Sequence, residues 1–406
     1  MILTVERLGH LGDAIAQGPR GPVLVAQALP GEVVEGEPVA GRIAAPRIVT
    51  PSPERVRAPC PHYRACGGCS LQHASDGFVA RWKADVVRSA LAGQGLEAPM
   101  RPVATSPARS RRRATLAGRR TRKGALVGFH GRASDTLTEI EHCLLLHPGL
   151  MAALPLLREV TMAGASRQGE LGLTLTLTTG GVDLAVTGGK PMDAPLFQAL
   201  AGLAERGDLA RLTWNGDPVA TRRPPAQRFG AAEVVPAPGA FVQATAEGEA
   251  ALLAAVSEAL GGARRIADLF AGSGTFALPL ASRAEVHAVE GEAAALAALD
   301  AGWRRAGGLH RLGTETRDLF RRPLLPDELR RFDAVVIDPP RAGAEAQAAE
   351  LAASTVPVIA AVSCNPVTFA RDARLLVAGG YRVDWVQVVD QFRWSPHVEL
   401  VARLSR

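Results

Sequence analysis

This sequence has no long apolar segment and very few lysines. No apolar run reaches the roughly 18–20 residues that a membrane-spanning helix needs, so no membrane partner is expected. The opening MILTVERLGH has no basic leader, which argues against a secretory signal and favours a cytoplasmic protein. Only three of the 46 basic residues are lysines, and the other 43 are arginines. Because arginine binds phosphates through two hydrogen bonds at once, the net charge of +6 favours a polyanionic partner.

Cysteine is also scarce, with five in 406 residues. Cys60, Cys66 and Cys69 have the spacing C-x5-C-x2-C in CPHYRACGGCS, and Cys143 follows in TEIEHCLLLHP. Four cysteines gathered in this way in a cytosolic protein favour a metal site over disulfides. All-thiolate ligation suits a [4Fe–4S] cluster or zinc. The x5 spacing differs from a short zinc knuckle and from the C-x3-C-x2-C pattern of radical enzymes, so we favour the cluster and keep zinc as the alternative.

Changes of pattern divide the chain into three domains. Residues 1–45 alternate short apolar runs with Gly and Pro, which is typical of a small β-barrel. Residues 46–235 are expected to form an α+β domain, with the cysteines, a helix over FVARWKADVVRSALAGQ, an arginine run and a hairpin in LGLTLTLTTGGVDLAVTGG. In residues 236–406, the short apolar strands RRIADLF, EVHAVE, RFDAVVID and VPVIAAVSC alternate with alanine-rich helices. That alternation predicts an α/β fold with a doubly wound, Rossmann-like parallel sheet.

A cofactor site is predicted at the carboxyl edge of this sheet. The segment DLFAGSGTFALPLA (268–281) runs from an apolar strand through a Gly-x-Gly turn into a helix. Glu290 ends the next strand, where a carboxylate can accept both ribose hydroxyls, and Asp338 ends the strand of FDAVVIDPPR. The alternative is that both are only solvated strand ends. Since no second glycine-rich phosphate loop follows, S-adenosylmethionine fits better than NAD or ATP.

The fifth cysteine, Cys364, lies in VSCNP at the end of an apolar strand. A lone cysteine is most often buried and inert. Here the proline stops the strand ladder, which leaves the thiol at the same edge as Glu290 and Asp338 and favours a nucleophile. Its acid–base partner is expected in DQFRWSPHVELV, where Glu399 follows His397.

These motifs together resemble one enzyme family. FVQAT, DLFAGSGTF, AVE, DPPRAG, SCNPVTFARD and HVE occur in the order and context of the RNA uridine-C5 (5-methyluridine) methyltransferases. The segment CPHYRACGGCSLQH, with Cys143, resembles the branch that carries a [4Fe–4S] cluster and acts on 23S ribosomal RNA. The N-terminal segment is similar to the RNA-binding TRAM barrel of that branch.

The resemblance implies a class I methyltransferase domain at the C-terminus, RNA as the partner and a monomeric enzyme. It implies that Cys364 adds to C6 of uracil and that Glu399 is the base that removes the C5 proton. The positions that contact S-adenosylmethionine in the family fall on Gln243, Phe270, Glu290, Asp318 and Asp338.

Several alternatives stay open. A transfer RNA substrate is the first, and a non-catalytic iron–sulfur RNA-binding protein is the second. An amino-methyltransferase with a Pro-Pro-aromatic loop is the third, although Arg341 stands here in place of the aromatic residue. Thr245 occupies a position where the family usually has Asn, and the N-terminal barrel is short for its type. The arginine run ARSRRRATLAGRRTRKG is either a phosphate-contacting surface or a solvated strand face.

Overall fold

The C-terminal part of the chain is built on one eight-stranded sheet in the computed structural model, which describes residues 1–406. In order across the sheet, the strands are β19 (Leu312–Thr316), β18 (Glu285–Glu290), β17 (Arg265–Leu269), β20 (Ala334–Ile337), β21 (Val358–Ser363), β23 (Leu400–Ser405), β22 (Arg382–Asp390) and β7 (Ala104–Thr105). β17 pairs in parallel with both β18 and β20, so the chain order reverses at β17. β23 runs antiparallel to its neighbours β21 and β22. A sheet of this kind binds ligands at its carboxyl edge, close to the reversal.

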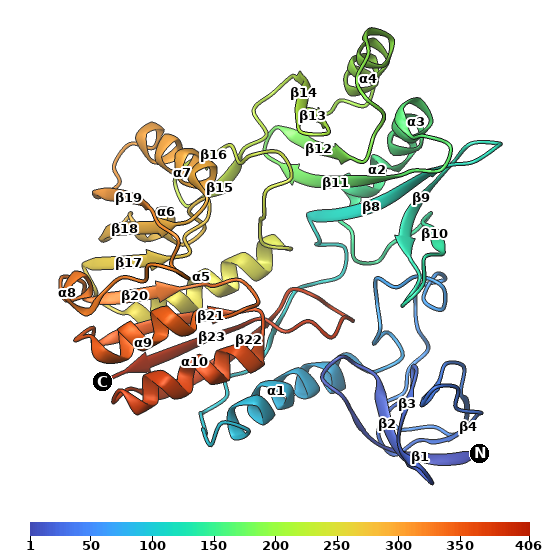
Figure 1. Ribbon diagram of the computed structural model, residues 1–406, viewed down its shortest axis with the longest axis horizontal. Helices are drawn as coiled ribbons and strands as arrows, with labels where there is room; N and C mark the ends of the chain where they lie inside the picture. Colours follow the sequence, from blue (N-terminus) through green and yellow to red (C-terminus); the bar gives the residue numbers. More distant parts are fainter.

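Helices cover both faces of this sheet (Figure 1). One face packs against α5 (Ala246–Leu260), α6 (Ala277–Leu280) and α7 (Ala293–Arg305), and the other against α1 (Asp76–Ala92), α9 (Glu345–Ala353) and α10 (Pro366–Ala378), with the short α8 (Pro326–Leu329) beside α9. All four residues of β20 are buried, as expected for a strand that is covered on both sides. The structure therefore confirms the doubly wound α/β sheet that was expected for residues 236–406.

Two elements of the predicted central domain (46–235) pack with this sheet instead. β7 forms its edge, in parallel with β22. Helix α1 begins at Ser75, whose hydroxyl accepts a hydrogen bond from the Phe78 N–H. Its apolar stripe is shared, because Val79 and Trp82 join the N-terminal core while Val87 and Leu91 join the core under α10. An apolar stripe in the sequence shows which face of a helix is buried, but it does not show which element packs against that face. The predicted boundary at residue 46 therefore did not anticipate that α1 packs against the C-terminal sheet.

The N-terminal part is a six-stranded sheet, visible at the blue end of the ribbon (Figure 1). In order, its strands are β5 (Arg42–Ile43), β3 (Gly21–Val25), β2 (Ala14–Gly18), β1 (Ile2–Leu8), β4 (Val33–Glu35) and β6 (Arg47–Thr50). The sheet thus extends to Thr50, past the predicted boundary at residue 45. β5 and β6 are its two edges and do not pair with each other, so the strand pairing describes a sheet and does not establish a closed barrel.

The central part is a seven-stranded sheet whose core contains α2 (Pro148–Ala152), α3 (Leu154–Gly164) and α4 (Ala194–Arg206). In order, its strands are β10 (Leu137–Glu139), β9 (Ala125–His130), β8 (Arg113–Arg120), β11 (Glu170–Thr178), β12 (Gly181–Thr187), β13 (Arg211–Trp214) and β14 (Asp217–Thr221). β11 and β12 form the predicted hairpin, with Thr178 opposite Gly181. A separate short hairpin, β15 (Gln227–Phe229) and β16 (Ala232–Val234), packs against α7.

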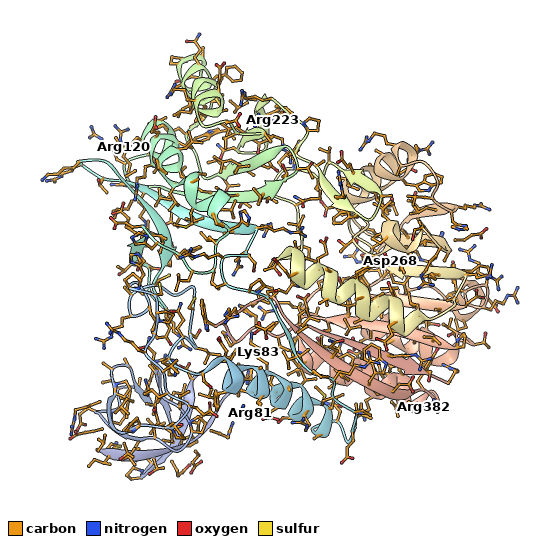
Figure 2. The ribbon with its side chains drawn as sticks, turned by 180° about the vertical axis from the view of Figure 1, so that it is seen from behind. Arg81, Lys83, Arg120, Arg223, Asp268 and Arg382 are labelled. Carbon is orange, nitrogen blue, oxygen red and sulfur yellow. The ribbon has the colours of Figure 1, made fainter.

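The arginine run is divided between structural and exposed positions. The Arg112 guanidinium donates to the Gln243 carbonyl at 3.0 Å, and Arg113 donates to the Gly239 carbonyl at 2.9 Å. These two arginines therefore attach the central sheet to the segment before α5. Arg120 lies on the projecting β8–β9 hairpin, where it is exposed to solvent (Figure 2). Arg109, outside this hairpin, is also exposed, and phosphate contact by the exposed arginines of this run stays a prediction.

Lys83 is the most completely buried cation of the protein and lies on α1 (Figure 2). Its Nζ donates to Asp390 Oδ1 at 2.5 Å and to the Phe392 carbonyl at 3.1 Å. The Lys83 and Asp390 side chains are 0% and 2% exposed.

None of the helices combines the length and apolar character that crossing a bilayer requires.

Replacing Lys83 by Met is expected to destabilise the fold by roughly 3–5 kcal/mol, because the buried Asp390 side chain loses its ion-pair partner. Urea denaturation would measure this loss. The matched control is Arg88→Met on the same helix, whose ion pair with Asp85 is exposed and is expected to contribute no more than about 0.5 kcal/mol. Equal losses for the two variants would contradict the structural role of the buried pair.

Candidate active site

Strand register brings Cys364 and Glu399 together at the carboxyl edge of the sheet. Ser363, the last residue of β21, pairs with Leu400, the first residue of the antiparallel β23. Cys364 and Glu399 are the next residues beyond this pair, one leaving β21 and the other entering β23. Asp338 directly follows the neighbouring β20. Three residues far apart in sequence thus meet at one edge because β23 runs opposite to the strands beside it.

Cys364 lies at the start of α10. The next residue, Asn365, caps this helix by accepting the Val367 N–H at 3.1 Å, and Pro366 takes the first helical position. Burial raises the pKa of the Cys364 thiol, and the carboxylates of Glu399 and Asp338 raise it further. The Arg341 guanidinium opposes this rise, and the amino end of a helix also favours a thiolate. The free thiol therefore stays protonated at neutral pH and needs a nearby acceptor to react.

The DPPRAG loop is held against the start of α10. Asn365 Nδ2 donates to the Arg341 carbonyl at 2.9 Å, and the Thr368 hydroxyl donates to the same carbonyl at 3.2 Å. Gly343 has φ +76°, and a Cβ there would lie 2.7 Å from Asp372 Oδ2. Only glycine fits this turn without strain. These contacts hold the Arg341 backbone next to the helix that carries Cys364.

Glu399 is buried and titrates far from its usual range. It is 4% exposed. Burial, together with the charge of Asp338, raises the pKa of Glu399 to about 8, and a hydrogen bond from Gln391 opposes the rise. Burial likewise raises the pKa of Asp338 to about 7. Two carboxyl groups that titrate near neutral pH beside a thiol are suited to proton transfer during a reaction.

The second group of predicted residues lies around β17, β18 and β19. The Glu290 carboxylate, at the end of β18, accepts the Gly272 N–H at 3.0 Å and the Glu292 N–H at 2.9 Å. Each carboxylate oxygen has a second lone pair, so both can still accept a ribose hydroxyl. Asp268 in β17 is completely buried (Figure 2), and burial followed by the charge of Asp338 and then that of Glu290 raises its pKa. Asp268 therefore lies between the two predicted cofactor carboxylates.

An aromatic pair completes this side of the edge. Phe270, directly after β17, has φ +62°, a strained backbone for a bulky residue that is typical of functional sites. Its ring centroid lies 5.4 Å from that of Phe320, which is 48% exposed. Asp318 accepts the Phe320 N–H at 3.0 Å. The pair offers an apolar surface beside Asp318 for a flat ring. Phe320, in RDLFRR, was not predicted, because a single aromatic residue among arginines carries no periodic signal.

Gln243 comes from outside the sheet and reaches Glu399 through Gln391. Gln391 Nε2 donates to Gln243 Oε1 at 2.6 Å and also to Glu399 Oε2. Thr245 caps α5 by accepting the Gly248 N–H at 2.9 Å. Because Asn and Thr are both good helix caps, the departure from the family pattern at residue 245 leaves the helix start intact. Gln391 was missed, since one amide after an apolar strand gives no sequence signal.

The four remaining cysteines line one cavity of about 500 Å³. They are Cys60, Cys66, Cys69 and Cys143, and none forms a disulfide. No three His, Cys, Asp or Glu side chains in the protein are arranged to hold a metal ion. The structure thus shows that the four cysteines gather and does not establish a metal.

Backbone N–H groups in this cavity donate hydrogen bonds to two of the cysteine sulfurs, which stabilises their thiolate form. The Gly68 N–H donates to Cys66 Sγ and the Leu145 N–H to Cys143 Sγ, both at 3.4 Å. Burial raises the pKa of Cys66 and of Cys143, so neither thiol ionises readily without a compensating cation. His397, in the segment that leads to Glu399, also lines this cavity.

Comparisons with known proteins agree with this geometry. The family model tRNA (Uracil-5-)-methyltransferase matches residues 308–406. A Brucella suis protein named as an RNA methyltransferase is 45% identical over 100% of this chain and 97% of its own length. The 23S rRNA (uracil(1939)-C(5))-methyltransferase of Chromohalobacter salexigens is 34% identical over 100% and 89%.

A solved structure shares the whole fold. The tRNA (uracil-54, C5)-methyltransferase of Pyrococcus abyssi, solved in complex with S-adenosyl-L-homocysteine, has a TM-score of 0.78 over 99% of both chains, at 24% identity. At 24% identity this structural similarity establishes only the shared fold, whereas the relatives of 45% and 34% identity establish the family. The chain therefore belongs to the S-adenosylmethionine-dependent RNA uracil-5-methyltransferase family, and it is an enzyme.

Proposed function

We propose that this enzyme methylates C5 of a uridine in RNA through a covalent bond between Cys364 and C6 of the base. The observation that carries the proposal is the meeting of Cys364 and Glu399 at adjacent strand ends, with Asp338 beside them. A thiol and a carboxyl group of raised pKa are the nucleophile and the base that this chemistry needs.

The reaction follows from the weakness of uracil C5 as a nucleophile. The Cys364 thiol gives its proton to solvent water, and the thiolate adds to C6, which moves the electrons of the C5–C6 double bond towards C5 and the neighbouring carbonyl. C5 then attacks the methyl group of S-adenosylmethionine, and S-adenosylhomocysteine leaves. The ionised Glu399 removes the C5 proton, the C5–C6 double bond forms again, and the Cys364 thiolate is expelled. The bond between Cys364 and C6 is thus broken again. The expelled thiolate takes up the proton that Glu399 removed from C5, and both groups return to their starting states.

The methyl donor is expected to lie across the reversal of the sheet, close to β17. We assign Glu290 to the ribose hydroxyls, Phe270 and Asp318 to the adenine, and Gln243 and Asp338 to the methionine end. The support is the pair of open carboxylate lone pairs on Glu290, the aromatic surface beside Asp318, and the link from Gln243 to Glu399. This arrangement directs the donor methyl group to the edge that holds Cys364.

We infer 23S ribosomal RNA as the substrate, with transfer RNA as the second candidate. The support for the first is the Chromohalobacter salexigens relative, which aligns with this whole chain. The target uridine must leave its stack to reach a half-buried thiol, at a cost of a few kcal/mol. The exposed β8–β9 hairpin and the N-terminal sheet are the surfaces that we assign to the surrounding RNA.

The substrate assignment is tested with the purified enzyme and tritiated S-adenosylmethionine. We expect methyl incorporation into 23S ribosomal RNA that lacks its 5-methyluridines, and at least about tenfold less into unmodified transfer RNA transcripts. Mapping of 5-methyluridine in RNA from a deletion strain would locate the base. Preferred methylation of transfer RNA, with unchanged 23S RNA in the deletion strain, would establish the second candidate instead.

We further propose that Cys60, Cys66, Cys69 and Cys143 hold a [4Fe–4S] cluster. The shared cavity and the N–H donors to two of the sulfurs support thiolate ligation. Zinc held by the same four thiolates is the alternative. Such a cluster would cross-link the cysteine loop to the segment before α2.

Protein purified without oxygen is expected to be brown and to contain about four irons and four sulfides per chain. Cys66→Ser should lose the colour and most of the iron, because one of four ligands is removed. The control is Cys364→Ser, which removes the thiol outside the cavity and should leave colour and iron unchanged. Colourless protein with one zinc per chain would contradict the cluster.

A further inference from the structure

Gln391 is a buried amide at the centre of the proposed active site. It directly follows β22 and is 2% exposed. Its Nε2 donates to Gln243 Oε1 at 2.6 Å and to Glu399 Oε2, and its Oε1 accepts the Thr245 N–H at 3.4 Å. One side chain thus joins a predicted donor-site residue, a predicted base and the cap of α5.

The orientation of this amide is determined by its partners. The Thr245 N–H can only donate, so it requires the oxygen of Gln391 on its side. The opposite orientation would place that oxygen against Gln243 Oε1 and, when Glu399 is ionised, against its carboxylate, so that acceptors would face one another. The backbone beside Gln391 is also held, because Asp390 Oδ1 accepts the Lys83 ammonium at 2.5 Å and the Phe392 N–H at 3.0 Å. The amide therefore cannot turn or withdraw at low cost.

Gln391 donates a hydrogen bond to one side-chain atom of each partner, namely Gln243 Oε1 and Glu399 Oε2. The other atoms, Gln243 Nε2 and Glu399 Oε1, make no hydrogen bond within the protein. Neither is among the enclosed polar atoms that lack a partner. A donor and an acceptor are thereby left available to ligands, one on each side of a fixed amide.

We infer that Gln391 is a positioning residue that holds the base Glu399 and the donor-site residue Gln243 as one unit, so that binding of the methyl donor and placement of the base are coupled. This inference rests on the proposed function, since it takes Glu399 as the base and Gln243 as a contact of S-adenosylmethionine.

The groups around Glu399 predict how loss of Gln391 would change the pKa of Glu399 and the pH dependence of the reaction. Asp338, after β20, is the acidic group whose charge raises the pKa of Glu399, and the Arg341 guanidinium lowers the pKa of the neighbouring Cys364 thiol. Lys83 is neutralised by Asp390. The Gln391 N–H is the contact that lowers the pKa of Glu399, so its removal raises that pKa. Because a base must be ionised to act, the rate should fall at neutral pH and recover as the pH rises.

The test compares Gln391→Leu with wild type in the full-length enzyme. The pH at which kcat/KM for RNA methylation reaches half its maximum should rise by about one unit, as expected for loss of one hydrogen bond to a charged group. Affinity for S-adenosylhomocysteine, measured by calorimetry, should fall about tenfold because Gln243 loses its fixed orientation. The matched control is Gln347→Leu, another fully buried amide, which bonds only to the Leu324 backbone. It should lose stability without a change in the pH profile or in affinity.

Gln391→Glu provides a second measurement if the leucine variant does not fold. It keeps the volume but adds a carboxyl group beside Glu399, so the half-maximal pH should rise by more than one unit. Unchanged pH profile and affinity in either folded variant would overturn the inference. Failure of the proposed function would look different, because wild-type enzyme would then methylate no uridine or Glu399→Gln would form no RNA adduct.

Discussion

Cys364→Ala is expected to lower the rate of RNA methylation by at least about 10⁴-fold and to leave the binding of S-adenosylhomocysteine within about twofold of wild type. Without the thiolate, uracil C5 has no route to the electron density that methyl transfer requires. Glu290, Phe270 and Gln243, the residues assigned to the methyl donor, are untouched by the change. Single-turnover transfer of tritium to 23S RNA, with calorimetry of S-adenosylhomocysteine, separates the two effects.

A neighbouring substitution provides the control for this result. Val367, on the same helix, is 60% exposed, and Val367→Ala should keep both activity and binding near wild type. Methylation retained by Cys364→Ala would refute the covalent mechanism. Loss of both methylation and donor binding would instead show that the thiol supports the structure of the site.

Glu399→Gln is expected to slow turnover by roughly 10²- to 10⁴-fold and to accumulate a covalent complex between RNA and protein. Addition of Cys364 and transfer of the methyl group do not need the carboxylate, whereas removal of the C5 proton does. The methylated adduct therefore forms and cannot eliminate. The glutamine side chain fits the same space and can still accept a hydrogen bond from Gln391, so folding should be preserved. A shifted band on a denaturing gel, sensitive to ribonuclease, measures the adduct.

Two further variants make this experiment decisive. Adding Cys364→Ala to Glu399→Gln should abolish the band, because the nucleophile is then missing. Glu249→Gln removes a carboxylate that pairs with Arg112 in the same part of the protein and should give no adduct. Rapid turnover and no adduct in Glu399→Gln would assign proton removal to another group, and Asp338, whose pKa burial raises to about 7, would be the first candidate.

Much of the site was predicted because its residues lie at strand ends. Glu290, Asp338 and Cys364 each close an apolar strand, and the carboxyl ends of parallel strands meet at one edge. The alternation of strands and helices predicted that edge, and the structure confirms the sheet. The roles of these residues stay predictions until the variants are measured.

Other features depend on contacts that no local pattern encodes. Gln391 meets Gln243 and Glu399 only because β22 and β23 lie side by side, and Lys83 reaches Asp390 across most of the chain. The apolar stripe of α1 predicted a buried face, yet two different cores share it. The predicted boundary at residue 45 followed composition, which does not report packing.

The sequence by itself determined the chemistry available to this protein: a free thiol, carboxylates after strands, four clustered cysteines and an arginine-rich surface. Residue type and strand period are local properties, so they can be read along the chain. Only the tertiary structure decided how far the pKa of Glu399 rises and which amide, Gln391, holds this carboxyl group. Those properties arise from burial and from the antiparallel register of β23, and both exist only once distant segments have packed together.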